Sequence, residues 1–311
     1  MTHVHQGPTD NALAERMAVE YIRGFVCTCA AHSLQRAVTE AVIADLSEKR
    51  TPARQDVLRN TYLNLVKHER KFKKMITAIW KEEEAIIIAN IRKLKKAWLR
   101  KDVVDSILYP VSMFVKKIAS GATQAYIDIM TTEGKRTAEI YDFDMVFDVH
   151  SPEIERFLKS YTPMFSKELE RVNVEKLRAE LIEGMRAGEG IPELMKRVNE
   201  TYRNWNKYRS INIARSEAIR ASNAAARETY RQSGVVKKLI WMANLDDRCC
   251  EFCEDLDGTI IGIEENFFDL GDVYEVERDG KKLSMNIDYT DVGHPGLHSL
   301  CRCAVGPWIE D

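Results

Sequence analysis

The chain has 311 residues, of which 45% are hydrophobic, enough for a sizeable core and for roughly two domains. Lys and Arg number 46 against 48 Asp and Glu, and the net charge of −2 excludes a chain-wide polycation. The 15 glycines and 8 prolines are too few for a largely disordered or fibrous chain. Since it has no run of 18 apolar residues and no signal-peptide pattern at its N-terminus, we expect no membrane span and synthesis in the cytosol.

The first third of the chain has the composition of helices. Residues 1–11 are predicted to be a flexible tail, and residues 12–130 a helical N-terminal region. Glycine is scarce there, and apolar residues recur at spacings of three and four, as in Ile76, Ile79 and Trp80. Breaks are expected at Thr51-Pro52 and Tyr109-Pro110, because proline lacks the N–H that continues a helix.

Residues 67–101 form a basic segment, with twelve Lys and Arg against four Glu. One interpretation is a helix that contacts DNA phosphates or an acidic partner. The other is the solvated face of an amphipathic helix, which is what such charge runs usually are. Candidate contact residues are Lys71, Lys73, Lys74, Arg92, Lys93, Lys95, Lys96 and Arg100.

The middle of the chain is predicted to be a connector followed by more helices. Residues 131–150, where aspartates and aromatics alternate, are the predicted connector, with a short strand as one alternative. Residues 151–234 are the second helical region, with Ser151 as N-cap and Pro152 at the first helical position. Further helices are expected near 174–187, from 192 to about 205 and over 207–233. Gly234 is expected to end the last of them in a left-handed conformation.

The spacing at which apolar residues recur changes after Gly234, and residues 235–311 are predicted to be a small β-rich module. A strand is expected near 235–245, followed by a turn at Asp247 and Arg248. Asp257-Gly258 and Asp279-Gly280 carry hairpin-turn signals. Residues 246–291 hold fifteen Asp and Glu against four Lys and Arg, a surface that repels nucleic acid. The predicted fold class is therefore mainly α, a long helical N-terminal two-thirds followed by a small β-rich (α+β) module.

The strongest local signal is a pair of Cys/His segments in this module. Cys250-x-x-Cys253 places two thiolates on one turn, and His298-x-x-Cys301-x-Cys303 offers three more donors. Four such ligands suit a tetrahedral structural zinc ion, which would clip two distant segments together. We favour Cys250, Cys253, His298 and Cys301, with Cys303 as the substitute for His298 or Cys301. Free thiols packed in a small core, or a disulfide, are the alternatives.

A catalytic role has little support in the residues. An open zinc site needs a general base beside it, and acids are so common here that none stands out. The zincin motif HExxH, the nucleophile motif GxSxG and a phosphate-binding glycine loop are all missing from the sequence. We therefore predict a protein that is not an enzyme.

Several of these segments, taken in order, resemble one family. The helix from Ile213 to Gly234, the segment from Trp241 to Gly258 and the closing His298-x-x-Cys301-Arg302-Cys303 look like the phage Mu F-like minor head proteins, also called head morphogenesis proteins. The likeness covers about residues 145–308, and residues 1–140 carry no motif that can be assigned.

The resemblance implies a virion component of a tailed phage, made in the host cytoplasm and located in the capsid interior or at the portal vertex. It implies binding to the portal protein or inner capsid during head assembly, and some such proteins are thought to leave with the genome. Non-specific contact with packaged DNA through residues 67–101 is a further expectation. The alternative function is a metal-dependent nuclease or toxin-like effector delivered with the phage genome.

Overall fold

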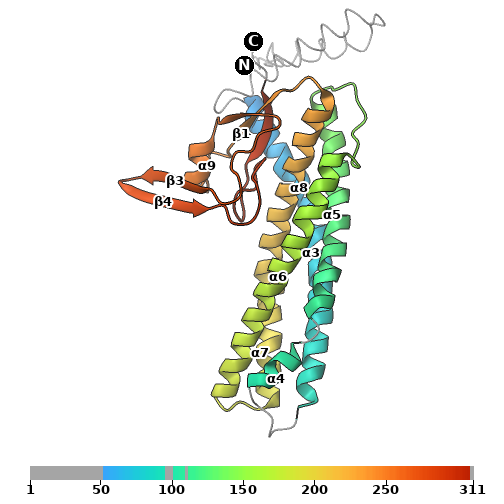
Figure 1. Ribbon diagram of the computed structural model, residues 1–311, viewed down its shortest axis with the longest axis vertical. Helices are drawn as coiled ribbons and strands as arrows, with labels where there is room; N and C mark the ends of the chain where they lie inside the picture. Colours follow the sequence, from blue (N-terminus) through green and yellow to red (C-terminus); the bar gives the residue numbers. More distant parts are fainter. Residues whose placement is uncertain (1–51, 95–100, 109–110, 309–311) are drawn as a thin grey trace, which may run out of the picture.

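The computed structural model describes residues 52–94, 101–108 and 111–308. Most of this part is a bundle of long helices, with a small module of strands beside its upper end (Figure 1). The predicted tail at residues 1–11 and the predicted helices before residue 52 lie outside the described residues. The predicted fold class, helical first and β-rich at the C-terminal end, is confirmed.

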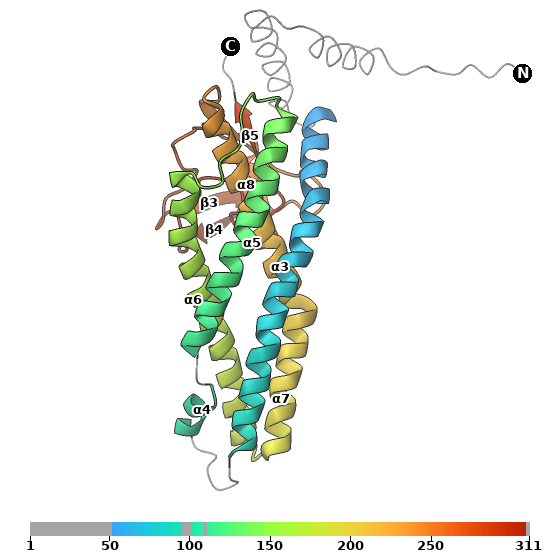
Figure 2. The same cartoon turned by 90° about the vertical axis from the view of Figure 1, so that its right-hand side faces the viewer.

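Four long rods make up the bundle (Figures 1 and 2). Helix α3 (Pro52–Arg92) is followed by the short α4 (Lys101–Ile107), and α5 (Val111–Ile140) then runs antiparallel to α3. Helix α6 (Pro152–Arg186) forms the third rod. The fourth is continuous, from α7 (Ile191–Asn204) through the π-helical turn η2 (Trp205–Arg209) into α8 (Ser210–Ser233).

Local signals in the sequence set several helix ends. The Ser151 hydroxyl accepts a hydrogen bond from the Ile154 N–H at 3.4 Å, so Ser151 is the N-cap of α6, as predicted. At the start of α7, the Glu193 carboxylate accepts from the Gly190 N–H at 3.0 Å. Gly234 ends α8 with φ +71°, the left-handed conformation expected of it.

A continuous apolar core runs along the bundle. On α3, the fully buried side chains Leu65, Phe72, Ile76 and Trp80 repeat at helical spacing and face the other rods. Tyr126 of α5 packs against Phe72 with ring centroids 5.6 Å apart. Burying each large apolar side chain contributes about 1.5–3 kcal/mol, so this core can stabilise the bundle by itself.

Two predicted boundaries in the helical part are wrong. Helix α5 continues to Ile140, ten residues into the predicted connector 131–150, because Glu133 and Thr137 are buried against the bundle. It ends where Asp142 adopts a positive φ of 50°. Helix α6 is unbroken from Pro152 to Arg186 and holds Pro163 inside it, whereas the sequence indicated separate helical segments there.

The module contains a three-stranded sheet and a hairpin. Strand β1 (Lys238–Met242) is central, with β2 (Ile260–Gly262) and β5 (Ala304–Trp308) antiparallel on its two sides. Ile240 of β1 pairs with Ile260 and with Gly306. Strands β3 (Val273–Arg278) and β4 (Lys281–Asn286) form a separate hairpin that projects from the molecule (Figure 1).

The two predicted hairpin turns have different outcomes. Asp279 and Gly280 join β3 to β4 with φ of 51° and 71°, so the tight turn predicted there is confirmed. Asp257 and Gly258 are no hairpin turn, because the residues before them form the short helix α9 (Glu251–Leu256). Gly258 has φ +86° and leads from α9 into β2.

Helix α8 holds the module through polar side chains on one face. Arg227 donates hydrogen bonds to the carbonyl groups of Ile263 and Gly293 at 2.8 and 2.7 Å. Asn223 binds the backbone of β5 and of the residue before it, and Ser216 accepts from the Leu300 N–H at 3.0 Å. Positions 216, 223 and 227 are separated by whole helical turns, so one helix face contacts the module at several points between Ile263 and β5.

Candidate metal centre

The first arm of the Cys/His cluster is built by the start of α9. Cys250 is the N-cap residue, with extended φ and ψ of −86° and 160°, and its sulfur accepts a hydrogen bond from the Cys253 N–H at 3.4 Å. The first helical turn then carries Cys253 back toward the same point. An N–H directed at a sulfur stabilises the thiolate form that a metal ion requires.

The second arm is a turn that closes just before β5. The Cys301 N–H donates to the His298 carbonyl group at 3.3 Å, and Leu300 adopts a positive φ of 63°. A left-handed residue without glycine's freedom is strained, and the hydrogen bond from the Leu300 N–H to Ser216 of α8 helps to hold it. Helix α8 therefore takes part in shaping the site.

All five predicted donors converge. The His298 Nε2 atom lies 3.1 Å from the sulfur of Cys250 and 3.1 Å from that of Cys253. The sulfur of Cys253 lies 3.9 Å from that of Cys301. Two trios of ligand atoms, each within 4.8 Å, result: Cys250, Cys253 and His298, and Cys253, Cys301 and Cys303. Sulfur ligands at about 2.3 Å from a tetrahedral zinc ion are about 3.8 Å apart, so the spacing suits a metal ion.

The imidazole of His298 is oriented for ligation. Its Nδ1 atom lies 2.8 Å from the carbonyl oxygen of Ser299, which can only accept. A proton therefore belongs on Nδ1, so that loss of the other ring proton leaves the lone pair of Nε2 facing the sulfur atoms. This arrangement, in which a carbonyl group fixes the tautomer of a ligating histidine, is common around zinc.

The cluster also separates charge among its members. A hydrogen bond from Cys253, supported by one from His298, lowers the pKa of Cys250 to about 4 against desolvation. Desolvation lowers the pKa of His298, but hydrogen bonding to Cys250 and the charge of Cys301 outweigh it and raise that pKa to about 9. Thiolate character at this site favours metal binding, which displaces the remaining protons.

Cys303 and Cys249 differ in their relation to the cluster. Cys303 is buried and belongs to the second trio, so it stays a candidate ligand beside Cys301. Cys249 is half-buried and lies outside both trios, and burial raises the pKa of its thiol to about 11. Within the described part of the chain, the donors thus form one cluster of four cysteines and a histidine.

The two arms are also joined by an ion pair that the sequence did not reveal. The carboxylate of Asp246 accepts hydrogen bonds from both terminal nitrogens of Arg302, at 2.6 and 2.5 Å. These bonds hold the pKa of Asp246 well below its usual range. Arg302 lies between the ligand candidates Cys301 and Cys303, so the pair ties the second arm to the turn before the first.

The predicted turn residues surround this ion pair. Asp247 and Arg248 are exposed at the centre of a turn that the Cys249 N–H closes by donating to the Asp246 carbonyl group at 3.0 Å. Arg248 pairs with the Asp246 carboxylate at 3.4 Å. Asp257 is buried and accepts from the Ala243 N–H at 2.8 Å, so it links the end of α9 to β1.

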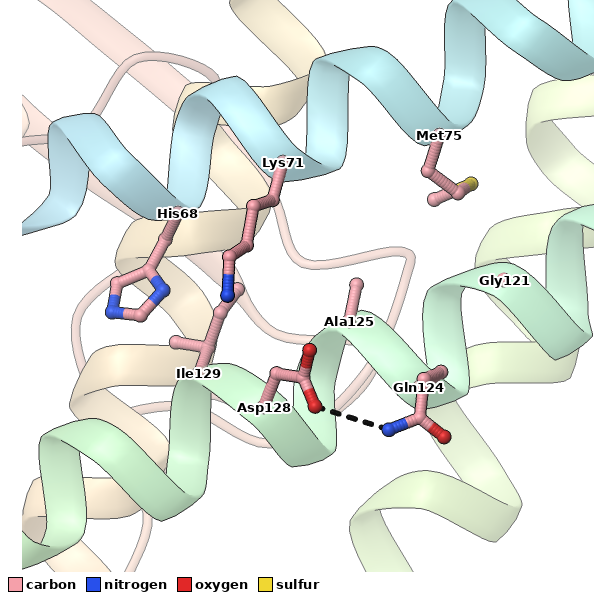
Figure 3. Close-up of a pocket in the computed structure, with 8 residues that line it drawn as sticks. All are labelled: His68, Lys71, Met75, Gly121, Gln124, Ala125, Asp128 and Ile129. Carbon is pink, nitrogen blue, oxygen red and sulfur yellow. Dashed lines mark hydrogen bonds between the residues drawn. The ribbon is translucent and has the colours of Figure 1, made fainter.

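The predicted contact residues that the structure describes lie on α3, except Lys93, which directly follows it. Figure 3 shows one of them, Lys71, extending from α3 beside the facing helix α5. Lys71, Lys74, Arg92 and Lys93 are exposed, and Lys73 is half-buried. The other three, Lys95, Lys96 and Arg100, lie outside the described residues.

The exposed cations of α3 form one stripe opposite the buried face. At about 100° per residue, six of them fall within roughly a quarter to a third of the helix circumference. These are Lys67, Arg70, Lys71, Lys74, Lys81 and Arg92. The acids beside the stripe are engaged elsewhere, since Glu69 pairs with Arg215 of α8 at 3.2 Å and Glu82 pairs with Lys117 of α5.

Comparison with known proteins gives one match. The family model described as "Phage Mu protein F like protein" matches residues 175–306, from the second half of α6 through α8 to β5. A search of curated proteins found no match, and a search of solved structures found none either. The predicted resemblance is thus confirmed over these residues, and the match suggests a phage head morphogenesis protein. No described helix has the length and apolarity needed to cross a membrane.

Proposed function

We propose that this protein is a minor capsid protein of a tailed phage that binds the portal or the inner capsid during head morphogenesis. The family match over residues 175–306 carries this proposal. The match includes the end of α6, the whole fourth rod of the bundle and the whole Cys/His cluster. We therefore assign the function to the docked pair of bundle and module, in the virion, rather than to the module alone.

The proposed role is structural rather than catalytic. Cys253, Cys301 and Cys303 are each only 2% exposed, so much of the cluster is closed to a substrate. Closed sites of sulfur and imidazole donors are typical of structural zinc. The ion pair with Arg302 further engages Asp246, the acid that begins the turn before the first arm, in holding the fold. This supports a protein that assembles with partners and is not an enzyme.

Co-expression with the portal protein of the same phage tests the main proposal. We expect the two proteins to elute together from a size-exclusion column after affinity capture of either one. The portal protein of an unrelated tailed phage is the matched control and should separate. Complete separation from the cognate portal and from the cognate major capsid protein would contradict the proposed partners.

The cofactor we propose is one structural zinc ion per chain. Cys250, Cys253, His298 and Cys301 are the favoured ligands, because His298 Nε2 lies against both thiols of the first arm and Cys301 lies against Cys253. Elemental analysis of freshly reduced, full-length protein should find one equivalent of zinc. Cys303→Ser should retain it, whereas Cys301→Ser should lose it. The reverse result would exchange these two ligands, and no metal in either protein would contradict the site.

A second proposed activity is contact with packaged DNA through the stripe on α3. The observation that favours it is the row of six exposed cations, whose neighbouring acids Glu69 and Glu82 are paired with cations of other helices. The described length of this row, from Lys67 to Arg92, is about 38 Å at 1.5 Å per residue, enough to reach several phosphates. The acidic module would face away from DNA or toward a protein partner.

Salt dependence distinguishes this contact from an ordinary solvated face. Each phosphate neutralised adds about 0.9 to the slope of log affinity against log salt. Replacing Lys71, Lys74 and Lys81 with Gln should therefore reduce the slope by about 2 to 3. Lys196→Gln on α7 is the control and should leave the slope unchanged, because Lys196 is an exposed cation of a different rod. Binding that is undetectable or independent of salt would leave only the solvated-face interpretation.

A further inference from the structure

A second polar cluster lies deep in the helical bundle, at the π-turn. Here α3 supplies Glu83, α6 supplies Glu170 and the fourth rod supplies Tyr202 and Arg209. Glu83 is 3% exposed, Glu170 is 1% exposed and Tyr202 is fully buried. Three of the four rods of the bundle therefore place ionisable groups at one level of an otherwise apolar core. Isolated π-turns within helices are frequently found at functional positions.

Arg209 is the cation of this polar cluster. Its guanidinium group lies over the ring of Trp205 at 5.1 Å and over the ring of Trp80 at 5.8 Å. Asn173 of α6 accepts a hydrogen bond from it. The π-turn carries one residue more per turn than an α-helix, which brings Arg209 to the same inward face as Trp205. The charge of Arg209 acts on both carboxyl groups.

The two carboxyl groups outnumber this cation. One oxygen of Glu83, one of Glu170 and the hydroxyl group of Tyr202 are buried, and hydrogen bonding of Glu83 to Glu170 and to Tyr202 links the three side chains. Two carboxylates facing one guanidinium would leave an uncompensated negative charge in the core, which is strongly unfavourable. If one carboxyl group keeps its proton, the second balances Arg209 and the core is neutral.

We propose that Glu83 and Glu170 share one proton in the folded bundle, and that this shared proton stabilises the packing of α3, α6 and α7 around the π-turn. Removing the proton at alkaline pH loosens this level of the bundle and leaves the Cys/His module docked at the other end. The device is separate from the contacts with portal or DNA proposed above.

The direction of the pH dependence follows from the groups that face the pair. Burial and the charge of Glu170 raise the pKa of Glu83 to about 9, and burial raises that of Glu170. The other charged or titratable groups that act on the pair are Tyr202 of α7 and Arg209 of η2. Glu84 of α3 acts on Tyr202, and Arg203 of α7 acts on Glu84. A carboxyl group whose pKa is raised in the folded state stabilises the fold fully only below its unfolded pKa, near 4.5. This stabilisation is lost as the pH rises through the folded pKa, near 9.

Isosteric replacements of the two glutamates in the full-length protein test the shared proton. Glu83→Gln mimics the protonated acid, so the midpoint of urea denaturation should be at least as high as in the unchanged protein at pH 7. In the unchanged protein this midpoint should decline between pH 7 and pH 9.5, and in Glu83→Gln most of that decline should be absent. Glu170→Gln should behave similarly. The double variant leaves Arg209 without a counter-charge, and its midpoint should lie below that of either single variant.

The control is Glu200→Gln, an exposed acid on α7, which should keep the alkaline decline. Hydrogen exchange at pH 9.5 should show faster exchange around Glu83 and Glu170 than at pH 7, normalised for the intrinsic rate, with no such increase over 238–308. The proposal fails if Glu83→Gln keeps the full decline, or if the double variant is as stable as the singles. Stabilisation by added Mg²⁺ at pH 9.5 would assign the pair to a bound cation and also overturn it.

Discussion

The helical bundle and the C-terminal module reach a folded state in different ways. The bundle buries long apolar side chains from four rods in one continuous core, with Leu177 and Leu181 of α6 fully buried in it. The core of the module is smaller, and three of its buried members are cysteines. Several of its backbone groups outside the strands are held by side chains of α8. The helical periodicity of apolar residues is therefore sufficient for the bundle to fold. The module also depends on its Cys/His donors and on the face of α8 against which it docks.

The largest effect is expected from Cys253→Ser, because Cys253 belongs to both trios of donors. Structural zinc contributes on the order of 10 kcal/mol to small zinc domains at pH 7, so losing a shared ligand should unfold the module. Hydrogen exchange should become fast over 238–308 and stay slow in the bundle. Chelation of zinc from the unchanged protein should give the same pattern.

The control for this loss is Cys249→Ser, since Cys249 lies outside both trios. It should keep both the metal and the slow exchange of the module. If Cys253→Ser left hydrogen exchange in the module unchanged, the apolar contacts and the α8 contacts would suffice, and the contrast between the two regions would disappear.

The converse experiment is a cavity in the bundle. Leu181→Ala removes a fully buried side chain from α6, and such truncations cost about 2–5 kcal/mol. Urea denaturation should show this loss, while the zinc content stays at one equivalent per chain. The neighbouring Ile182 is only half-buried, so Ile182→Ala should cost less. Loss of zinc in Leu181→Ala would show that the two regions unfold as one unit.

The sequence predicts most reliably what neighbouring residues determine. Ser151 caps α6, Gly234 ends α8 and Asp279-Gly280 makes a tight hairpin turn, because each signal acts within a few residues. Asp257-Gly258 carries a similar dipeptide signal, but the short helix α9 before it changes its role. Dipeptide signals therefore hold only where the flanking segments can also form strands.

Other features depend on contacts between distant segments. Two Cys/His segments at recognisable spacings were enough to predict that the donors converge. The ion pair of Asp246 with Arg302 was not predicted, because acids are frequent there and no periodicity selects one. Glu83 lies within a run of three glutamates, and only the packing of α3 against α6 and α7 distinguishes it from exposed neighbours.

A smaller effect is expected at the junction of the two regions, from Asn223→Ala. The Asn223 amide donates to the Cys303 carbonyl group at 3.1 Å and accepts from the Val305 N–H at 2.8 Å. The substitution leaves both backbone groups buried without their partner, at a cost of about 1–3 kcal/mol. Exposed Asn212 on the same helix provides the control, Asn212→Ala. Faster exchange should appear first in β5, and an unchanged β5 would show that docking does not rest on this residue.

The smallest effect is expected from Ser151→Ala, which concerns the bundle alone. Its hydroxyl group satisfies the Ile154 N–H at the start of α6, and losing such a cap costs about 1 kcal/mol. The melting temperature should fall by roughly 2–4 °C. Ser160→Ala, an exposed site within the same helix, should change it less. Because Ser151 lies before the matched residues 175–306 and far along α6 from the π-turn, zinc content and the alkaline decline should both stay the same. A change in either would mean that the loss of this N-cap affects the structure along the whole of α6. The continuous core of the bundle would then not be enough to keep the effect local.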